Sequence, residues 1–247
     1  MPNPLLAKSD AFGQALLDYL ETGQETTYLI IRVEDGHTDD VPSSSYFQSF
    51  DEWSELDRAV TVWAKGRVLD VGVGPGRLSL YLQDKGHDVV AIDKSEKVLK
   101  VAKARGVRDA RFHDILRGPL ESELFQTIAL FGCNIGIAGK FDNVGPFLGT
   151  LASMLSPGGR ILGSGSNWNR TDNPEHLSFH ELKRKAGRHP AEMVLKIAYK
   201  GLDEEFGFCL VNQDELRAIA PTVGLEVEAI IDCGGRYGFV LKKPESR

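Results

Sequence analysis

The sequence has few cysteines, no long apolar run and no excess of basic residues. The three cysteines, Cys133, Cys209 and Cys233, lie far apart without the ligand spacing of a zinc site, and they fit a reducing cytosol. No run of about 18 apolar residues occurs and the N-terminus lacks a signal-peptide core, which argues against a membrane-spanning or exported protein. The net charge of −6 disfavours nucleic acid as a partner, because nucleic-acid-binding domains usually carry a basic patch. We therefore expect a soluble cytoplasmic protein without a membrane partner.

A short apolar strand followed by a glycine-rich turn is the strongest local signal in this chain of 247 residues. Residues 67–71 (Arg-Val-Leu-Asp-Val) predict a strand buried on both faces. Three glycines follow at alternate positions within residues 72–76, and Leu78, Tyr81 and Leu82 then recur at helical spacing. A buried strand, a tight turn and a helix in this order form the first unit of a nucleotide-binding sheet, with the ligand on the turn.

The residues around the turn indicate which ligand it binds. A dinucleotide fingerprint reads G-x-G-x-x-G, whereas these glycines read G-x-G-x-G and follow an acid, Asp70. A carboxylate would repel a pyrophosphate but suits a ligand that carries an ammonium group. The stretch from Val68 to Gly76 resembles motif I of the class I S-adenosylmethionine-dependent methyltransferases, hydrophobic-hydrophobic-Asp-x-Gly-x-Gly-x-Gly, at every position. The resemblance implies that S-adenosylmethionine is the cofactor.

The order of predicted elements along the rest of the chain indicates an α/β fold. The last two strands are joined by residues 233–235 (Cys-Gly-Gly), which is a hairpin signal. Strand–helix alternations closed by such a hairpin are the order of class I methyltransferases, and the resemblance covers about residues 66–241. It implies a Rossmann-like, doubly wound, seven-stranded and mostly parallel sheet with an antiparallel C-terminal hairpin. The strands are expected at residues 67–71, 88–93, 107–113, 125–131, 160–163, 225–232 and 237–241.

We expect the chain to divide into an N-terminal extension and a main domain. Residues 1–50 form the extension, a candidate lid over the ligand, and residues 51–247 form the methyltransferase domain. An insertion at about residues 164–211 interrupts the strand–helix alternation. Local signals in these regions predict a helix capped by Ser9, an extended segment at 26–33, a loop at 34–45, a helix capped by Asp51, and a hairpin formed by 193–199 and 206–211.

The resemblance also assigns cofactor contacts to residues at the ends of successive strands. Asp93 would accept hydrogen bonds from the ribose hydroxyls, and Asp114 would accept one from the adenine amino group while the Ile115 amide donates to a ring nitrogen. Asn134 would meet the amino-acid end through its backbone, and Asp70 would act on the ammonium through the loop or a water molecule. The implied cofactor-binding set is Asp70, Gly72, Val73, Gly74, Gly76, Asp93, Lys94, Asp114, Ile115 and Asn134.

We expect an enzyme that transfers a methyl group to oxygen or nitrogen of a small-molecule acceptor. The segment at residues 131–136 differs from Asp/Asn-Pro-Pro-Tyr/Phe, a motif that resembles enzymes methylating the amino groups of adenine or glutamine. It also lacks the Pro-Cys nucleophile expected for methylation of cytosine C5. The acids Glu204 and Glu205 fall in an expected hairpin turn, which is not where protein-arginine methyltransferases place theirs. Two alternatives remain open, a non-catalytic cofactor-binding or scaffold protein and an NAD(P)-dependent oxidoreductase.

The sequence does not assign a catalytic residue. A general base is required only where the acceptor is protonated, as in a phenol, an alcohol or an ammonium group. His37, His176 and His180 are candidates, with Asp172 and Glu181 in the same polar neighbourhood. Two of these histidines are four residues apart, a spacing that also suits a metal pair, but no third ligand has supporting spacing and we expect no metal site.

Overall fold

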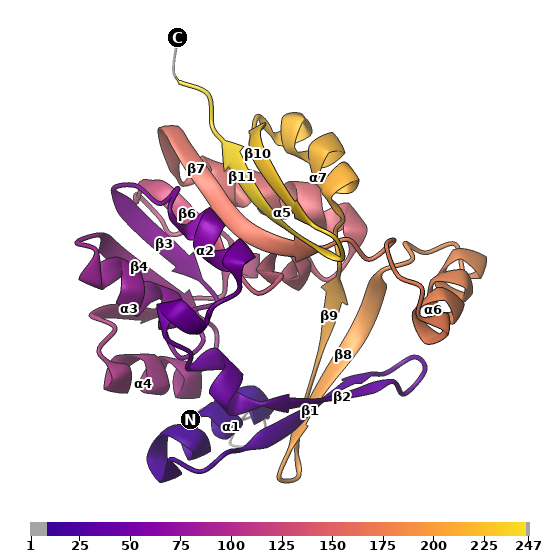
Figure 1. Cartoon of the computed structure of the whole chain (residues 1–247). Helices are drawn as coiled ribbons and strands as arrows, with labels where there is room; N and C mark the ends of the chain where they lie inside the picture. The colour runs from indigo at the N-terminus through magenta and orange to yellow at the C-terminus, as the bar shows by residue number, and fades with distance from the viewer. Residues whose placement is uncertain (1–8, 246–247) are drawn as a thin grey trace, which may run out of the picture.

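Two β-sheets form the framework of the protein (Figure 1). The computed structural model describes residues 9–245, so the first eight positions of the expected extension and the last two of the main domain lie outside the described residues. Figure 1 shows the smaller sheet lying below the ends of the strands of the larger one. Among the described residues, no helix has both the length and the hydropathy needed to cross a lipid bilayer.

The larger sheet has seven strands in the order β10-β11-β7-β6-β3-β4-β5. Strands β3 to β7 are parallel to one another, and β11 is antiparallel to both β7 and β10. The predicted doubly wound sheet with an antiparallel C-terminal hairpin is thus confirmed. Its strand order reverses between β3 and β6, where sheets of this kind bind ligands. The strands are β3 (Arg67–Val71), β4 (Asp88–Asp93), β5 (Asp109–Phe112), β6 (Phe125–Leu130), β7 (Leu155–Ser166), β10 (Glu226–Cys233) and β11 (Arg236–Lys242).

Helices cover both faces of this sheet because its central strands are apolar on both faces. On one face Leu78 and Leu82 pack against Val68 and Val89. On the other face a larger cluster joins the sheet to the helices at residues 141–153 and 213–219. The first face carries α2 (Glu55–Thr61), α3 (Arg77–Asp84) and α4 (Glu96–Arg105), and the second carries α5 (Phe141–Ser153) and α7 (Gln213–Ile219).

The smaller sheet joins the N-terminal extension to the insertion. Its four strands are antiparallel in the order β2-β1-β8-β9, and β1 pairs with β8 so that Leu29 lies opposite Ala198. The helix α1 packs on one end of this sheet through Ala11 and Ala15, and α6 lies at the outer edge of the molecule (Figure 1). The elements are α1 (Ala11–Thr22), β1 (Thr27–Arg32), β2 (Thr38–Pro42), α6 (Pro174–Lys185), β8 (Glu192–Tyr199) and β9 (Leu202–Cys209).

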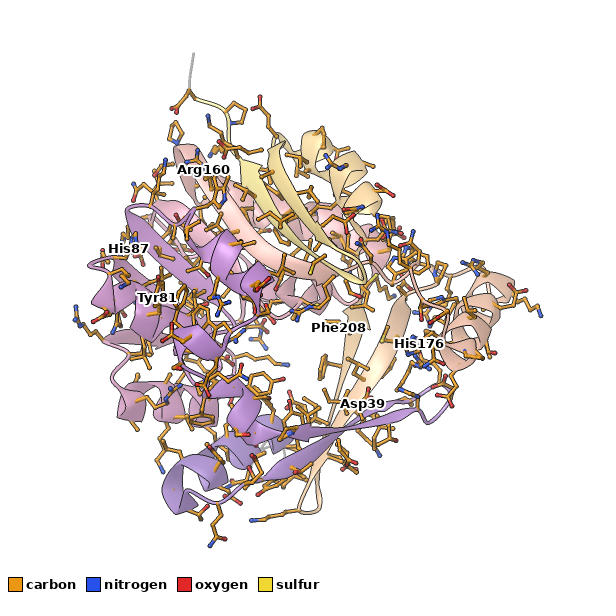
Figure 2. All side chains as sticks on the ribbon, in the orientation of Figure 1. Asp39, Tyr81, His87, Arg160, His176 and Phe208 are labelled. Atoms are coloured by element: carbon orange, nitrogen blue, oxygen red, sulfur yellow. The ribbon has the colours of Figure 1, made fainter. Side chains whose placement is uncertain are left out.

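One face of the smaller sheet is turned toward the larger sheet. Ile30 lies opposite Ile197, and Met193 lies opposite Phe208, so these side chains share a face. The Phe208 ring packs directly on Gly136, which follows β6. Figure 2 shows this ring projecting from β9 into the space between the sheets. We call this the inner face of the smaller sheet.

Several local predictions were wrong in their details. The expected loop at residues 34–45 contains β2, which is largely exposed and has no apolar pattern because it is an edge strand held by β1. Asp10 rather than Ser9 caps α1, and Ser54 rather than Asp51 caps α2. Five short 3-10 helices complete the described chain: η2 (Ser43–Tyr46), η3 (Phe50–Glu52), η4 (Ile115–Arg117), η5 (Asn134–Ala138) and η6 (Ala220–Val223).

Two strands extend beyond their predicted limits. The hairpin of the insertion turns at residues 200–201, so β9 begins at Leu202 and includes the acids expected in the turn. Lys200 and Gly201 both have positive φ, which a two-residue hairpin turn requires. Strand β7 begins at Leu155 instead of residue 160, with an irregular register beside β6, and continues to Ser166.

Candidate functional site

The glycine turn after β3 has the backbone conformation that its sequence predicts. Gly72, Gly74 and Gly76 all have positive φ, which side chains rarely tolerate. A Cβ on Gly72 would lie 2.5 Å from Asn134 Nδ2, whereas a Cβ on Gly74 would meet no atom within 4 Å. The turn is therefore packed at its start and open over its middle glycine, where a ligand has room.

Asp70 is buried just before this turn. Its side chain is only 4% exposed, and its Oδ2 accepts a hydrogen bond of 2.6 Å from the Ser79 hydroxyl of α3. Burial raises the pKa of Asp70 to about 6, although the bonds from Ser79 and the charge of Arg77 oppose the shift. An ionised carboxylate in this position gives the open side of the turn a negative potential, which suits an ammonium group.

Asp93 lies at the end of the neighbouring strand β4. Its Oδ1 accepts a 2.9 Å hydrogen bond from the backbone of Ser95, and burial raises the pKa of Asp93 to about 6, with the nearby charge of Asp10 adding to the shift. The Ser95 hydroxyl caps α4 and also donates to Asp10 Oδ2 at 2.6 Å. Helix α1 is thus fixed beside the carboxylate predicted to bind the ribose.

The remaining predicted residues lie on the adjoining strand ends. Asn134 uses its side chain to donate to the carbonyl of Val71 at 2.8 Å, which ties the end of β6 to the end of β3. Asp114 accepts from the Leu116 amide at 3.2 Å and so caps its own turn, in which Ile115 is buried. The predicted set is thus spread over the ends of β3 to β6, with Asp114 and Ile115 farthest along the sheet.

The side chain of Lys94, also in the predicted cofactor set, contacts the smaller sheet. Its Nζ lies 3.2 Å from Glu204 Oε1 and 5.4 Å from the centre of the Phe206 ring. Both partners belong to β9, so this side chain bridges the larger and smaller sheets. The bridge holds β9 beside the end of β4 that is predicted to bind the ribose.

A cavity of about 360 Å³ lies at the other end of the inner face, and we call it the side pocket. Strands β1 and β8 form its floor, α6 forms one wall, and the segment after β7 forms the other. Figure 2 shows His176 on α6 and Asp39 on β2 near this end of the sheet. Its lining includes Ile30, Arg32, Trp168, Arg170 and Phe179, with Met193, Leu195 and Leu210.

The three candidate histidines all line the side pocket. The rings of His37 and His176 lie edge to face with centroids 5.9 Å apart, and His176 Nδ1 is 3.0 Å from the Thr171 hydroxyl. His37 is held by Glu175 at 3.0 Å. His180 is buried against Trp168, and desolvation followed by nearby positive charges lowers its pKa to about 4, so it is neutral at pH 7.

The sequence analysis missed Arg32, Trp168 and Phe179, which line the same pocket. An arginine at the end of a strand has no distinctive local pattern, and the other two occur in a segment read as an insertion. Within residues 9–245, no three side chains of histidine, cysteine or acidic type are grouped closely enough to hold a metal ion. The other two polar candidates, Asp172 and Glu181, are exposed and do not line the side pocket, and Glu181 lies on α6 beside Arg184 and Lys185.

Two glycine substitutions should separate cofactor binding from folding. Gly74→Ala adds a methyl group in open space and should cost about 1–2 kcal/mol of unfolding free energy from its positive φ, while weakening S-adenosylhomocysteine binding about tenfold. Gly76→Ala also places its Cβ 2.5 Å from a Val107 methyl group and should lose more stability. Denaturant unfolding and calorimetric titration measure the two effects. Equal stability losses would contradict the open geometry at Gly74.

Comparison with known proteins connects this geometry to a family. A family model described as a methyltransferase domain matches residues 68–159, which include the glycine turn and Asp93. The chain is similar to a ubiquinone biosynthesis O-methyltransferase from Dechloromonas aromatica, with 29% identity over 190 residues that cover 76% of this chain and 75% of the relative. It is 38% identical over 76 residues to an uncharacterized methyltransferase from Staphylococcus carnosus, a match that covers 30% of this chain and only 37% of that relative.

A solved structure matches nearly the whole fold. The crystal structure of an S-adenosylmethionine-dependent methyltransferase from Bacteroides fragilis, in complex with S-adenosylhomocysteine, has a TM-score of 0.81 and 26% identity over 97% of both chains. These matches support the methyltransferase expectation over the nicotinamide-dependent and non-catalytic alternatives. With motif I on a turn at the switch point of the sheet, these matches support a class I S-adenosylmethionine-dependent methyltransferase.

Proposed function

We propose that the chain transfers the methyl group of S-adenosylmethionine to an oxygen atom of a small molecule bound between the two sheets. The observation that supports the proposal is the inner face of the smaller sheet, which extends from the glycine turn to the side pocket. Phe208 packs beside the loop after β6, and its cross-strand neighbour Met193 lines the side pocket. Oxygen is favoured because the Dechloromonas aromatica relative, which aligns with three quarters of the chain, is an O-methyltransferase.

In this proposal the residues at the strand ends hold the cofactor. Asp93 accepts hydrogen bonds from the ribose hydroxyls, and the ends of β5 and η4 bind the adenine through Asp114 and Ile115. The turn at residues 72–76, including Val73, lies against the amino-acid part, Asp70 attracts its ammonium, and the backbone of Asn134 contacts the same end. The open side of Gly74 and the two buried carboxylates fit a ligand that carries a ribose and an ammonium group and no phosphate. When bound, the cofactor supplies an electrophilic methyl group.

The protein's own task is to align the acceptor and to exclude water. The bridge from Lys94 to β9 and the Phe208 ring close one side of the space between the sheets. A hydroxyl acceptor must lose its proton as the new bond forms. Thr171 holds the His176 ring in the side pocket, at the end of the inner face away from the glycine turn, so the role proposed for His176 is to contact the far end of the acceptor.

A labelled-methyl assay tests this function. The purified chain is incubated with methyl-labelled cofactor and panels of phenols, carboxylic acids and amines, and we expect labelled methyl ethers or esters. His176→Ala should raise the KM for the acceptor about tenfold while cofactor affinity stays unchanged. Ser178→Ala, two residues along α6 from His176, is the matched control. Labelled products only from amines would contradict transfer to oxygen.

A further inference from the structure

The side pocket contains an arginine whose position is fixed before any ligand binds. Arg32, at the end of β1, is 8% exposed and lines the cavity. Its Nε and Nη2 donate to the two carboxylate oxygens of Asp35 at 2.8 and 2.6 Å. The guanidinium also lies 4.1 Å from the centre of the Phe179 ring. These contacts leave the side chain little rotational freedom.

The contacts of Arg32 use only one edge of its guanidinium. Five N–H bonds point outward in a planar fork, so one arginine can hold two carboxylates, one on the Nε/Nη2 edge and one on the Nη1/Nη2 edge. Asp35 occupies the first edge. Among residues 9–245, no group accepts a hydrogen bond from Nη1, and Nη1 is not among the buried atoms that lack a partner. Nη1 therefore keeps some solvent-exposed surface, and Arg32 lines the cavity.

Basic side chains lie on both walls of the cavity, and acids pair with Arg32 and Arg170. Arg170 lines the opposite wall and uses Nη1 for Asp232, and His37 and His176 lie nearby. The acid in the lining, Asp39, is 3.6 Å from a nitrogen of His37.

The rest of the cavity suits an apolar body. Its floor and walls include Ile30, Trp168, Met193, Leu195 and Leu210. Its volume of about 360 Å³ is more than twice the ~150 Å³ of an apolar cavity that holds benzene. The pocket therefore has room for one substituted aromatic ring or two fused rings.

We propose that the methyl acceptor is an aromatic carboxylic acid, whose carboxylate binds the free Nη1/Nη2 edge of Arg32 and whose ring extends along the inner face toward the cofactor. This proposal rests on the proposed function. Strand β1 is two strands away from β9, or roughly 10 Å at ~4.8 Å a strand, and β9 packs on the loop beside the cofactor turn. The carboxylate is thus an anchor, and a hydroxyl at the other end of the ring receives the methyl group. As the oxygen–methyl bond forms, the sulfur–methyl bond breaks, the hydroxyl proton leaves to a base, and S-adenosylhomocysteine is released.

Calorimetric titration of isosteric ligands tests the anchor. The chain is saturated with S-adenosylhomocysteine and titrated with 4-hydroxybenzoate, 4-hydroxybenzamide, tyramine or phenyl phosphate. We expect 4-hydroxybenzoate to bind at least tenfold more tightly than each of the others. Arg32→Gln should remove the preference over the amide, Arg32→Lys should retain part of it, and Arg108→Gln, an exposed arginine on the larger domain, should leave it unchanged.

The outcomes separate this inference from the function on which it rests. Equal or tighter binding of the amide, the amine or the phosphate overturns the carboxylate anchor, and so does binding of none of the four. Failure of S-adenosylhomocysteine to bind the wild-type chain overturns the proposed function instead. The wild-type series decides the question even if Arg32→Gln fails to fold, because the amide and the acid differ only in charge and in one polar group.

Discussion

Asp93→Ala should raise the Kd for S-adenosylhomocysteine about 100-fold. In the proposed complex its carboxylate accepts two hydrogen bonds from the ribose, and each charge-assisted bond contributes about 1.5 kcal/mol, so their loss costs roughly two factors of ten. Burial already raises the pKa of this carboxyl, so ligand hydroxyls that solvate it restore interactions that the free protein lacks. Calorimetric titration at pH 8, where the carboxyl is ionised, measures the change.

A matched control for this substitution lies on the same strand. Asp88 begins β4 at the opposite edge of the sheet and pairs with Arg67 at 3.0 Å, with 71% of its side chain exposed. Asp88→Ala removes the same groups from the same strand and should leave the Kd within about twofold, since an exposed ion pair contributes little. An unchanged Kd for Asp93→Ala, with native unfolding behaviour, would place the ribose elsewhere.

The parallel sheet could be predicted because each of its strands has a signal within its own short segment of the sequence. Strands β3, β4 and β6 are covered by helices on both faces, so most of their residues are apolar and each strand appears as a short hydrophobic run. The glycine turn was predictable for a related reason. All three glycines have positive φ, and Gly72 also packs closely against Asn134, so other residues are disfavoured there and a pattern remains in the sequence.

The smaller sheet could not be predicted as a unit. Strand β2 is an exposed edge with acids at two of its five positions, and it forms only because β1 is beside it. The pairing of β1 with β8 joins residues more than 160 positions apart, as when Ile30 meets Ile197, and nothing in either segment specifies the other. The expected lid and insertion were therefore treated as separate regions.

The side pocket could not be predicted from the sequence for the same reason. Arg32 comes from β1 and Phe179 from α6, and their contact exists only after the two distant segments have paired. The N-cap of α1 also depends on a contact between distant segments. Ser9 and Asp10 are both good capping residues, and the hydrogen bond between Asp10 and Ser95 on another helix favours the second.

Asp70→Asn should stabilise the ligand-free protein at pH 8 by about 2–3 kcal/mol. Burial raises the folded-state pKa to about 6, above the value near 3.9 of an unfolded chain, so the folded state binds more protons between these limits. The free energy of unfolding of the wild type therefore falls as pH rises from about 4 to 6, and a shift of two pKa units corresponds to roughly 3 kcal/mol. Above pH 6 the ionised carboxylate carries the full penalty, which the neutral amide avoids.

This gain should disappear at pH 4 and should be accompanied by weaker cofactor binding. At pH 4 the wild-type carboxyl is protonated when folded, so urea unfolding should give the two proteins nearly equal stability. The amide oxygen can still accept from Ser79, but it cannot attract an ammonium, so the Kd for S-adenosylhomocysteine should rise about tenfold at pH 8. Asp40→Asn on exposed β2 is the charge-matched control and should change neither quantity. Lower stability of Asp70→Asn at pH 8 would mean that its neighbours stabilise the carboxylate more than burial penalises it. Higher stability with weaker binding would show that the fold retains a destabilising charge because the ligand requires it.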